Sequence, residues 1–164
     1  MANSTYLLIT AGVFLFSIIY LYLGKIVYKL FKIKSDAVTY ESSKEALGRI
    51  ANWTTWLTGL QTAAIAVMGL LFKDPSPNLK IYGFFAILFF GASIILATWL
   101  LSSLPSIQQR LINSKEPDER NDIYMMKIFS FIPFRLGRFS GLVHTYFLFG
   151  IVFYALFIFE IFNK

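Results

Sequence analysis

The chain has 164 residues, of which 57% are hydrophobic and only 15% are charged, and its mean hydropathy is +0.63. A soluble domain carries about 25% charged residues, so this composition disfavours an aqueous globule. The net charge of +6 does not indicate nucleic-acid binding, because the Lys and Arg residues flank apolar stretches and are mixed with acidic residues. The chain has no cysteine, which excludes disulfides, thiolate metal sites and haem attachment through cysteine.

Four long uncharged stretches are each close to the ~20 residues that span a bilayer. They cover residues 5–24, 53–72, 81–101 and 139–159. The first is expected to be a retained span and not a signal peptide, because its basic residues follow it. The sequence therefore predicts an all-α integral membrane protein of one domain, with four transmembrane helices in an up-down bundle.

The Lys and Arg residues are distributed very unevenly between the connections. Of the 15, six lie between the first and second stretches and six between the third and fourth, which leaves Lys73, Lys80 and Lys164. The positive-inside rule then places loops 25–52 and 104–138 in the cytoplasm. Both termini are expected outside, in a plasma or inner membrane.

The connections have distinct compositions. Residues 25–33 mix apolar residues with lysines and are expected to form an interfacial helix, while 35–49 reads as a polar helix leading into the second span. The outer connection, 73–80, is rich in turn residues and predicts a tight hairpin. Pro105 is expected to close the third span on the inside. Residues 124–138 form a second amphipathic cytoplasmic segment, expected to lie along the membrane surface.

Small residues recur at helical spacing in the spans, and such residues let membrane helices approach closely. Because a short hairpin joins the second and third spans, we expect their small faces to pack on each other. An interface between copies of the chain is the alternative. The candidate packing residues are Thr55, Gly59, Thr62, Ala66 and Gly69 in the second span, Gly83, Ala86, Ser93 and Ala97 in the third, and Gly137 and Gly141 in the fourth.

Polar residues of three spans are expected at one depth, in the cytoplasmic half of the bundle, below a Phe-rich outer half. Unsatisfied polar groups are costly in hydrocarbon, so these residues must pair with each other, with the backbone, or with water in a cavity open to the inside. This candidate polar layer, or ligand-contact region, comprises Thr55, Thr58, Gln61, Thr62, Thr98, Ser102, Ser140, His144 and Thr145. Trp53, Trp56 and Trp99 lie near the predicted inner boundary and are expected to form an aromatic belt.

His144 is the only histidine and has two interpretations. It is either a pH-responsive or ligand-binding group, or a neutral ring bonded to Gln61, to a threonine or to a carbonyl that fixes the packing of the fourth helix. One histidine without cysteines or intramembrane carboxylates cannot build a metal or bis-histidine haem site. We therefore expect no cofactor or metal, and we assign no catalytic residue.

No span interior contains Asp, Glu, Lys or Arg, and no span contains an internal proline, which disfavours an ion-coupled transporter. The leading hypothesis is a non-enzymatic protein that self-assembles or docks with membrane partners. Its specific version is a gated pore or membrane effector, in which the polar layer wets an inward-facing vestibule.

Two alternatives remain open. The first is a lipid or small-molecule binding protein, or a membrane enzyme, with a cytoplasmic-side pocket around His144. The second is an accessory subunit of a larger membrane complex. The expected partners are the bilayer itself, anionic lipid head groups at the basic loops, and a second copy of the chain or another membrane protein.

Overall fold

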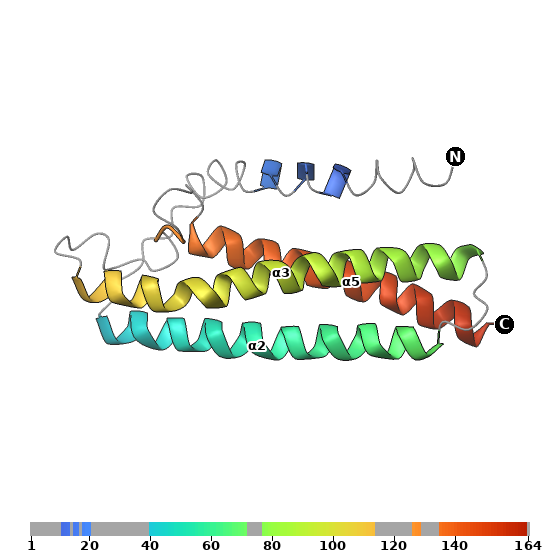
Figure 1. Cartoon of the computed structure of the whole chain (residues 1–164), viewed down its shortest axis with the longest axis horizontal. Helices are drawn as coiled ribbons and strands as arrows, with labels where there is room; N and C mark the ends of the chain where they lie inside the picture. The colour runs from blue at the N-terminus through green and yellow to red at the C-terminus, as the bar shows by residue number, and fades with distance from the viewer. Residues whose placement is uncertain are drawn as a thin grey trace.

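The computed structural model describes residues 11–13, 15–16, 18–20, 40–71, 77–113, 126–128 and 135–163. These residues are almost entirely helical. They form three long helices (Figure 1), which are α2 (Tyr40–Leu71), α3 (Pro77–Asn113) and α5 (Leu136–Phe162). Each of the three is long and apolar enough to cross a membrane.

The predicted first span is covered only in part. Its described residues between Ala11 and Tyr20 are helical and belong to a shorter apolar helix. The predicted interfacial helix at 25–33 lies outside the described residues, as do the beginning of the outer hairpin and most of 114–134. Three long apolar helices are therefore confirmed, and the fourth span and the amphipathic segments stay predictions.

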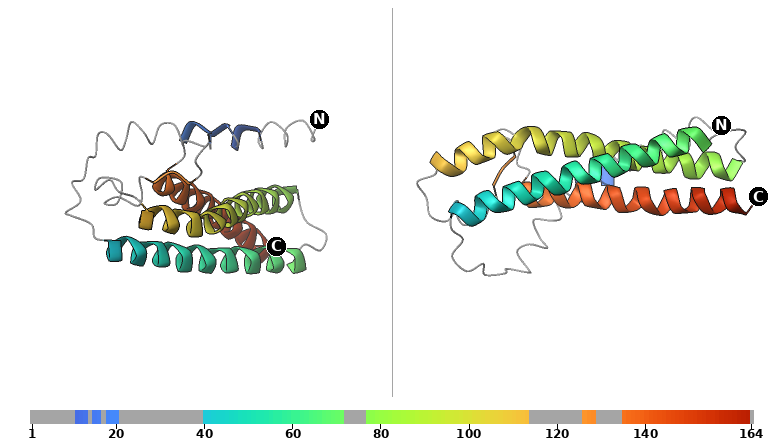
Figure 2. Two further views of the ribbon diagram at one scale, coloured as in Figure 1. Left: turned by 60° about the vertical axis from the view of Figure 1, so that its left-hand side comes forward. Right: turned by 90° about the horizontal axis from the view of Figure 1, so that it is seen from below.

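The three helices run side by side with alternating direction (Figures 1 and 2). Helix α3 packs most extensively on α5 and less extensively on α2, while α2 and α5 make few contacts with each other. The start of α2, the end of α3 and the start of α5 meet at one end of the bundle, which we call the basic end. Its described basic residues are Lys44, Arg49, Arg110, Lys127, Arg135 and Arg138.

The helices extend well beyond the predicted spans. The 32 residues of α2 are about 48 Å long at ~1.5 Å per residue, compared with a hydrocarbon core of about 30 Å. Helix α3 does not end at Pro105 but continues to Asn113. A proline inside a helix removes one backbone hydrogen bond and costs about 3 kcal/mol. The burial of Ile107 and Leu111 beyond it offsets this cost, since both are almost fully buried.

These extensions share a hydrophobic core of their own. Leu47 and Ile50 of α2 pack there with apolar residues of α3 and α5, and Ile128 joins them from the connecting segment. The Arg110 guanidinium donates hydrogen bonds to the carbonyls of Lys127, at 2.6 Å, and Ile128, at 3.1 Å. The Leu136 N–H donates to the Met126 carbonyl. The basic end is therefore a folded unit held by contacts from all three helices.

A second core lies toward the opposite end and is rich in phenylalanine. Met68 of α2 packs there with Phe90 of α3 and Phe157 of α5. The ring of Phe90 occupies the space that a Cβ atom at Gly150 would need, so α3 and α5 approach each other closely at this point. The described residues of the first apolar stretch also contact α5, because the Tyr146 hydroxyl donates to the Val13 carbonyl at 2.9 Å.

The small residues of the third span lie inside the bundle, and those of the fourth are half-buried. Gly83, Ala86, Ser93 and Ala97 of α3 are all buried. Gly137 of α5 is half-buried, and the Tyr20 hydroxyl lies 2.9 Å from the position of a Cβ at Gly141.

The small residues of α2 differ from this expectation. Thr55, Gly59, Thr62, Ala66 and Gly69, which we call the α2 small face, are all exposed. Helix α2 instead turns Leu57, Gln61 and Met68 inward. The Gln61 amide needs a partner in an apolar bundle and finds it on α3. Ala66 follows Gln61 by five residues, about 140° around the helix, so the small face lies on the far side.

Candidate functional site

The predicted polar layer does not converge on one cavity. Most of its hydroxyl groups donate to carbonyls of their own helix one turn earlier, a bond that needs no partner across the bundle. This holds for Thr55, Thr58, Thr62, Thr98, Ser102 and Thr145. Of these, Thr55, Thr62, Thr98 and Ser102 lie on the exposed surface of α2 or α3.

One buried polar connection links all three helices. The Gln61 Nε2 group on α2 donates to Ser93 Oγ on α3 at 2.7 Å, and Ser93 Oγ donates to the Val143 carbonyl of α5 at 2.9 Å. Gln61 is 1% exposed, and its Oε1 atom has no hydrogen-bond partner among the described residues. The sequence identified Gln61 as a polar residue that must be satisfied, but it identified Ser93 only as a small packing residue.

His144 makes two hydrogen bonds, one as a donor and one as an acceptor. Its Nδ1 atom lies 2.7 Å from the Ser140 carbonyl, and its Nε2 atom accepts the indole N–H of Trp53. A carbonyl only accepts and an indole N–H only donates, so this pair of contacts requires a neutral ring with its proton on Nδ1. The Trp53 and His144 rings are also stacked, with centroids 6.0 Å apart. A carbonyl is thus one partner of His144, while the other is Trp53 and not Gln61 or a threonine.

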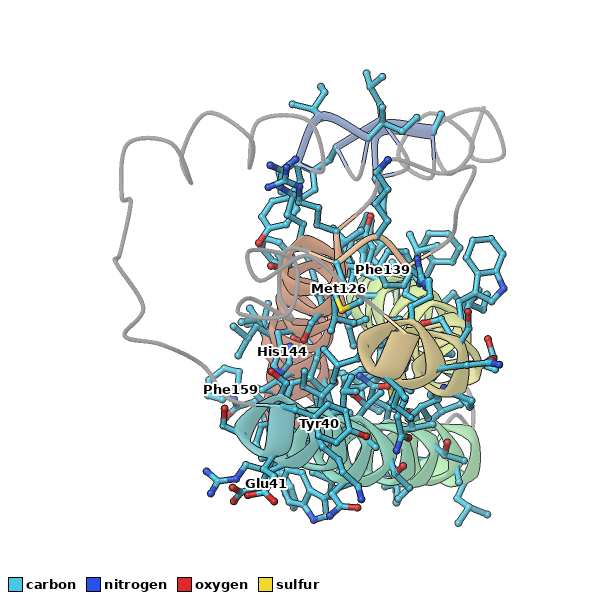
Figure 3. The ribbon with its side chains drawn as sticks, turned by 90° about the vertical axis from the view of Figure 1, so that its left-hand side faces the viewer. Tyr40, Glu41, Met126, Phe139, His144 and Phe159 are labelled. Carbon is cyan, nitrogen blue, oxygen red and sulfur yellow. The ribbon has the colours of Figure 1, made fainter. Side chains whose placement is uncertain are left out.

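A groove opens beside this pair at the basic end, with a volume of about 470 Å³. Figure 3 looks onto this end and shows His144 on the side of α5 that faces α2. Helix α2 supplies most of the groove, from residues that recur on one side of the helix, and α5 supplies the rest. The lining residues are Ser42, Glu45, Ala46, Arg49, Ile50, Trp53, Ser140 and His144.

Two charged residues of the groove form an ion pair. The Arg49 guanidinium lies 2.6 Å from the Glu45 carboxylate one turn earlier, and the two side chains are 78% and 63% exposed. In the sequence alone, Arg49 counts only among the basic residues that determine topology, and Glu45 only among the acidic residues mixed with them. Their spacing from Trp53, at four and eight residues, is the signal that would have placed all three on one side of a helix.

Within the ranges that the structure describes, no group of three His, Asp or Glu side chains is placed to hold a metal ion. The groove has features of a binding site, because an ion pair, two serines, two aromatic rings and two aliphatic residues line it together.

Comparison with known proteins adds neither a family nor a related fold. No protein-family model, curated protein or solved structure matches this chain.

Proposed function

We propose that this chain is a non-enzymatic multi-pass membrane protein that assembles with a second copy of itself through the α2 small face. The observation that carries the proposal is the outward direction of this face. All five of its residues are exposed, and a Cβ added at Gly59 or Gly69 would meet no atom within 4 Å. No described residue of the same chain packs on this small-residue surface of α2.

Helices in lipid associate mainly through close van der Waals packing, and small residues provide it by letting backbones approach. A glycine in an exposed helix interior costs about 1 kcal/mol relative to alanine. Contacts with the described part of the chain do not offset that cost at Gly59 and Gly69. A two-fold symmetric pair would offset it, because each copy would present the same face to the other.

The remaining exposed surface of α2 differs from the small face. Trp56, Leu60 and Val67 are large, exposed and on another side of the helix. Such residues suit contact with lipid chains, whereas a row of glycine, alanine and threonine leaves a shallow surface that another helix fills better.

The pore hypothesis takes a modified form in this arrangement. Thr55 and Thr62 belong to the α2 small face, and their hydroxyls bond to their own helix. A vestibule wetted by these threonines would therefore lie between copies of the chain and not inside one. The accessory-subunit alternative places a different membrane protein on the same face.

The test is cross-linking in native membranes, where no detergent competes for the interface. The chain has no cysteine, so Gly59→Cys introduces a unique thiol. We expect Gly59→Cys to form a covalent dimer under mild oxidation. The matched control is Gly91→Cys on α3, which has equally open space but lies outside the α2 small face, and it should stay monomeric.

The mass of the intact particle in mild detergent gives the second measurement. We expect a dimer or larger assembly for the unmodified chain and a monomer for the double variant Gly59→Leu/Gly69→Leu, with Gly91→Leu unchanged. A monomeric unmodified chain that forms no Gly59→Cys dimer would overturn the proposal. A stoichiometric second protein in place of the second copy would overturn self-assembly in favour of the accessory-subunit alternative.

A further inference from the structure

The groove at the basic end lies beside a ring of exposed tryptophans. The Gln61–Ser93 hydrogen bond sets the register of the antiparallel helices α2 and α3. In this register Trp56 of α2 is level with Trp99 of α3, and Trp53 lies one turn nearer the basic end. All three tryptophans are exposed. Exposed tryptophans at one level of a membrane protein mark the boundary between lipid and water. Trp53 also lines the groove, so the groove begins at this boundary and extends into the water-exposed end of α2.

The charges of the groove are balanced. Among the lining residues that the structure describes, Glu45 and Arg49 are the only charged ones, and they neutralise each other. Because both side chains are largely exposed, solvent screens their pairing and a ligand can separate them at little cost. A ligand with one group of each sign satisfies both residues, whereas a ligand of net charge leaves one of them without a partner.

The two charged residues of the groove indicate which charge each end of the ligand carries. Arginine binds phosphate oxygens through several parallel N–H donors, so Arg49 is the phosphate partner. Glu45 is the partner of a cation, and the hydroxyls of Ser42 and Ser140 line the same groove. These oxygen acceptors suit a primary ammonium, which donates three hydrogen bonds, better than a quaternary ammonium, which donates none.

We infer that the groove binds the phosphoethanolamine head group of a bilayer phospholipid, with Arg49 on the phosphate and Glu45 on the ammonium. The acyl chains would remain in the bilayer beside Trp53, where the groove meets the membrane boundary. The groove volume of about 470 Å³ is that of a small-ligand site. This inference is independent of self-assembly, because the groove and the α2 small face lie on different sides of α2.

The test is native mass spectrometry of the full chain, released from mild detergent with added phospholipids of identical acyl chains. The three lipids carry phosphoethanolamine, phosphocholine or phosphoglycerol head groups. We expect the unmodified chain to retain one phosphoethanolamine lipid about tenfold more than either of the others, the effect of one charge-assisted hydrogen bond. Free glycerophosphoethanolamine should not displace it, because the acyl chains keep the lipid in the detergent micelle around the protein at high local concentration.

Three variants make the assignment specific. Arg49→Gln should reduce retention of the phosphoethanolamine lipid about tenfold, and Glu45→Gln should shift the preference toward the anionic phosphoglycerol lipid. Lys44→Gln is the matched control, since Lys44 is exposed on the same turn of α2 but does not line the groove. All three positions are exposed, so the variants should keep the melting temperature of the unmodified chain.

Equal retention of the three lipids, or equal losses with Arg49→Gln and Lys44→Gln, would overturn the site. Displacement by free glycerophosphoethanolamine at the affinity of the lipid would keep the head-group chemistry but overturn the bilayer as its source. Unchanged lipid retention by the Gly59→Leu/Gly69→Leu variant would confirm that the site does not depend on assembly.

Discussion

Phe90 of α3 places its ring where a side chain at Gly150 of α5 would lie, and this contact sets how closely the two helices approach. We expect Gly150→Ala to lower the free energy of unfolding by about 1–3 kcal/mol, since the added methyl group forces the ring or the helix to move. Thermal unfolding in detergent, followed by circular dichroism, measures this change. Gly91→Ala is the control, because its space is open, it lies outside the α2 small face and alanine is the better helix former by about 1 kcal/mol. Equal melting temperatures for both variants would contradict the packing described here.

Ser93 connects Gln61 to the Val143 carbonyl, so its removal affects two helices at once. We expect Ser93→Ala to cost about 1–3 kcal/mol, because the buried Gln61 amide then loses its acceptor. Gln61→Leu should cost less, since it also removes the Oε1 atom that has no partner among the described residues. A double-mutant cycle should give a coupling energy between the two positions of about 0.5–3 kcal/mol. Additive effects would show that the two side chains do not act together.

His144 and Trp53 form a pair that a single substitution can separate. We expect His144→Phe to lower the free energy of unfolding by about 1–3 kcal/mol, because it removes the hydrogen bonds to both Trp53 and the Ser140 carbonyl, each with a usual net contribution of about 0.5–1.5 kcal/mol. In a Trp53→Phe background the same substitution should cost measurably less, because the indole donor is already absent. If the cost of His144→Phe is the same in both backgrounds, His144 contributes through another contact.

The orientation of the chain is testable with single cysteines, because the sequence contains none. Ser42 at the basic end and Lys80 at the opposite end are both exposed. The positive-inside rule predicts that an impermeant thiol reagent added to intact cells labels Lys80→Cys and spares Ser42→Cys until the membrane is opened. The reverse pattern would invert the predicted topology.

The three long helices could be predicted because uncharged stretches of about 20 residues have few other stable states in a protein. Their ends could not be predicted as well. Helix α3 passes through Pro105 because Ile107 and Leu111 are buried at the basic end, and that core involves residues far apart in the sequence. Such long-range contacts cannot be predicted from the residues next to Pro105 in the sequence.

The rotation of α2 about its own axis, which decides which face is buried, could also not be predicted from the sequence. Both the small face and the face with Leu57, Gln61 and Met68 were reasonable packing surfaces. The partner of Gln61 decides between them, and Ser93 lies 32 residues away on another helix. The groove was missed for a different reason, since Glu45 and Arg49 look like ordinary loop charges until His144 of α5 is placed opposite Trp53.

Helix α2 runs without interruption from Tyr40 to Leu71, so the groove and the small face belong to one stiff rod. Glu45 and Gly69 are separated along its axis by about 36 Å at ~1.5 Å per residue, so a tilt of about 3° displaces one end by about 2 Å relative to the other. A head group that draws the water-exposed end of α2 toward α5 would tilt the whole helix. The tilt of α2 in the bilayer would then depend on the lipid composition of one leaflet.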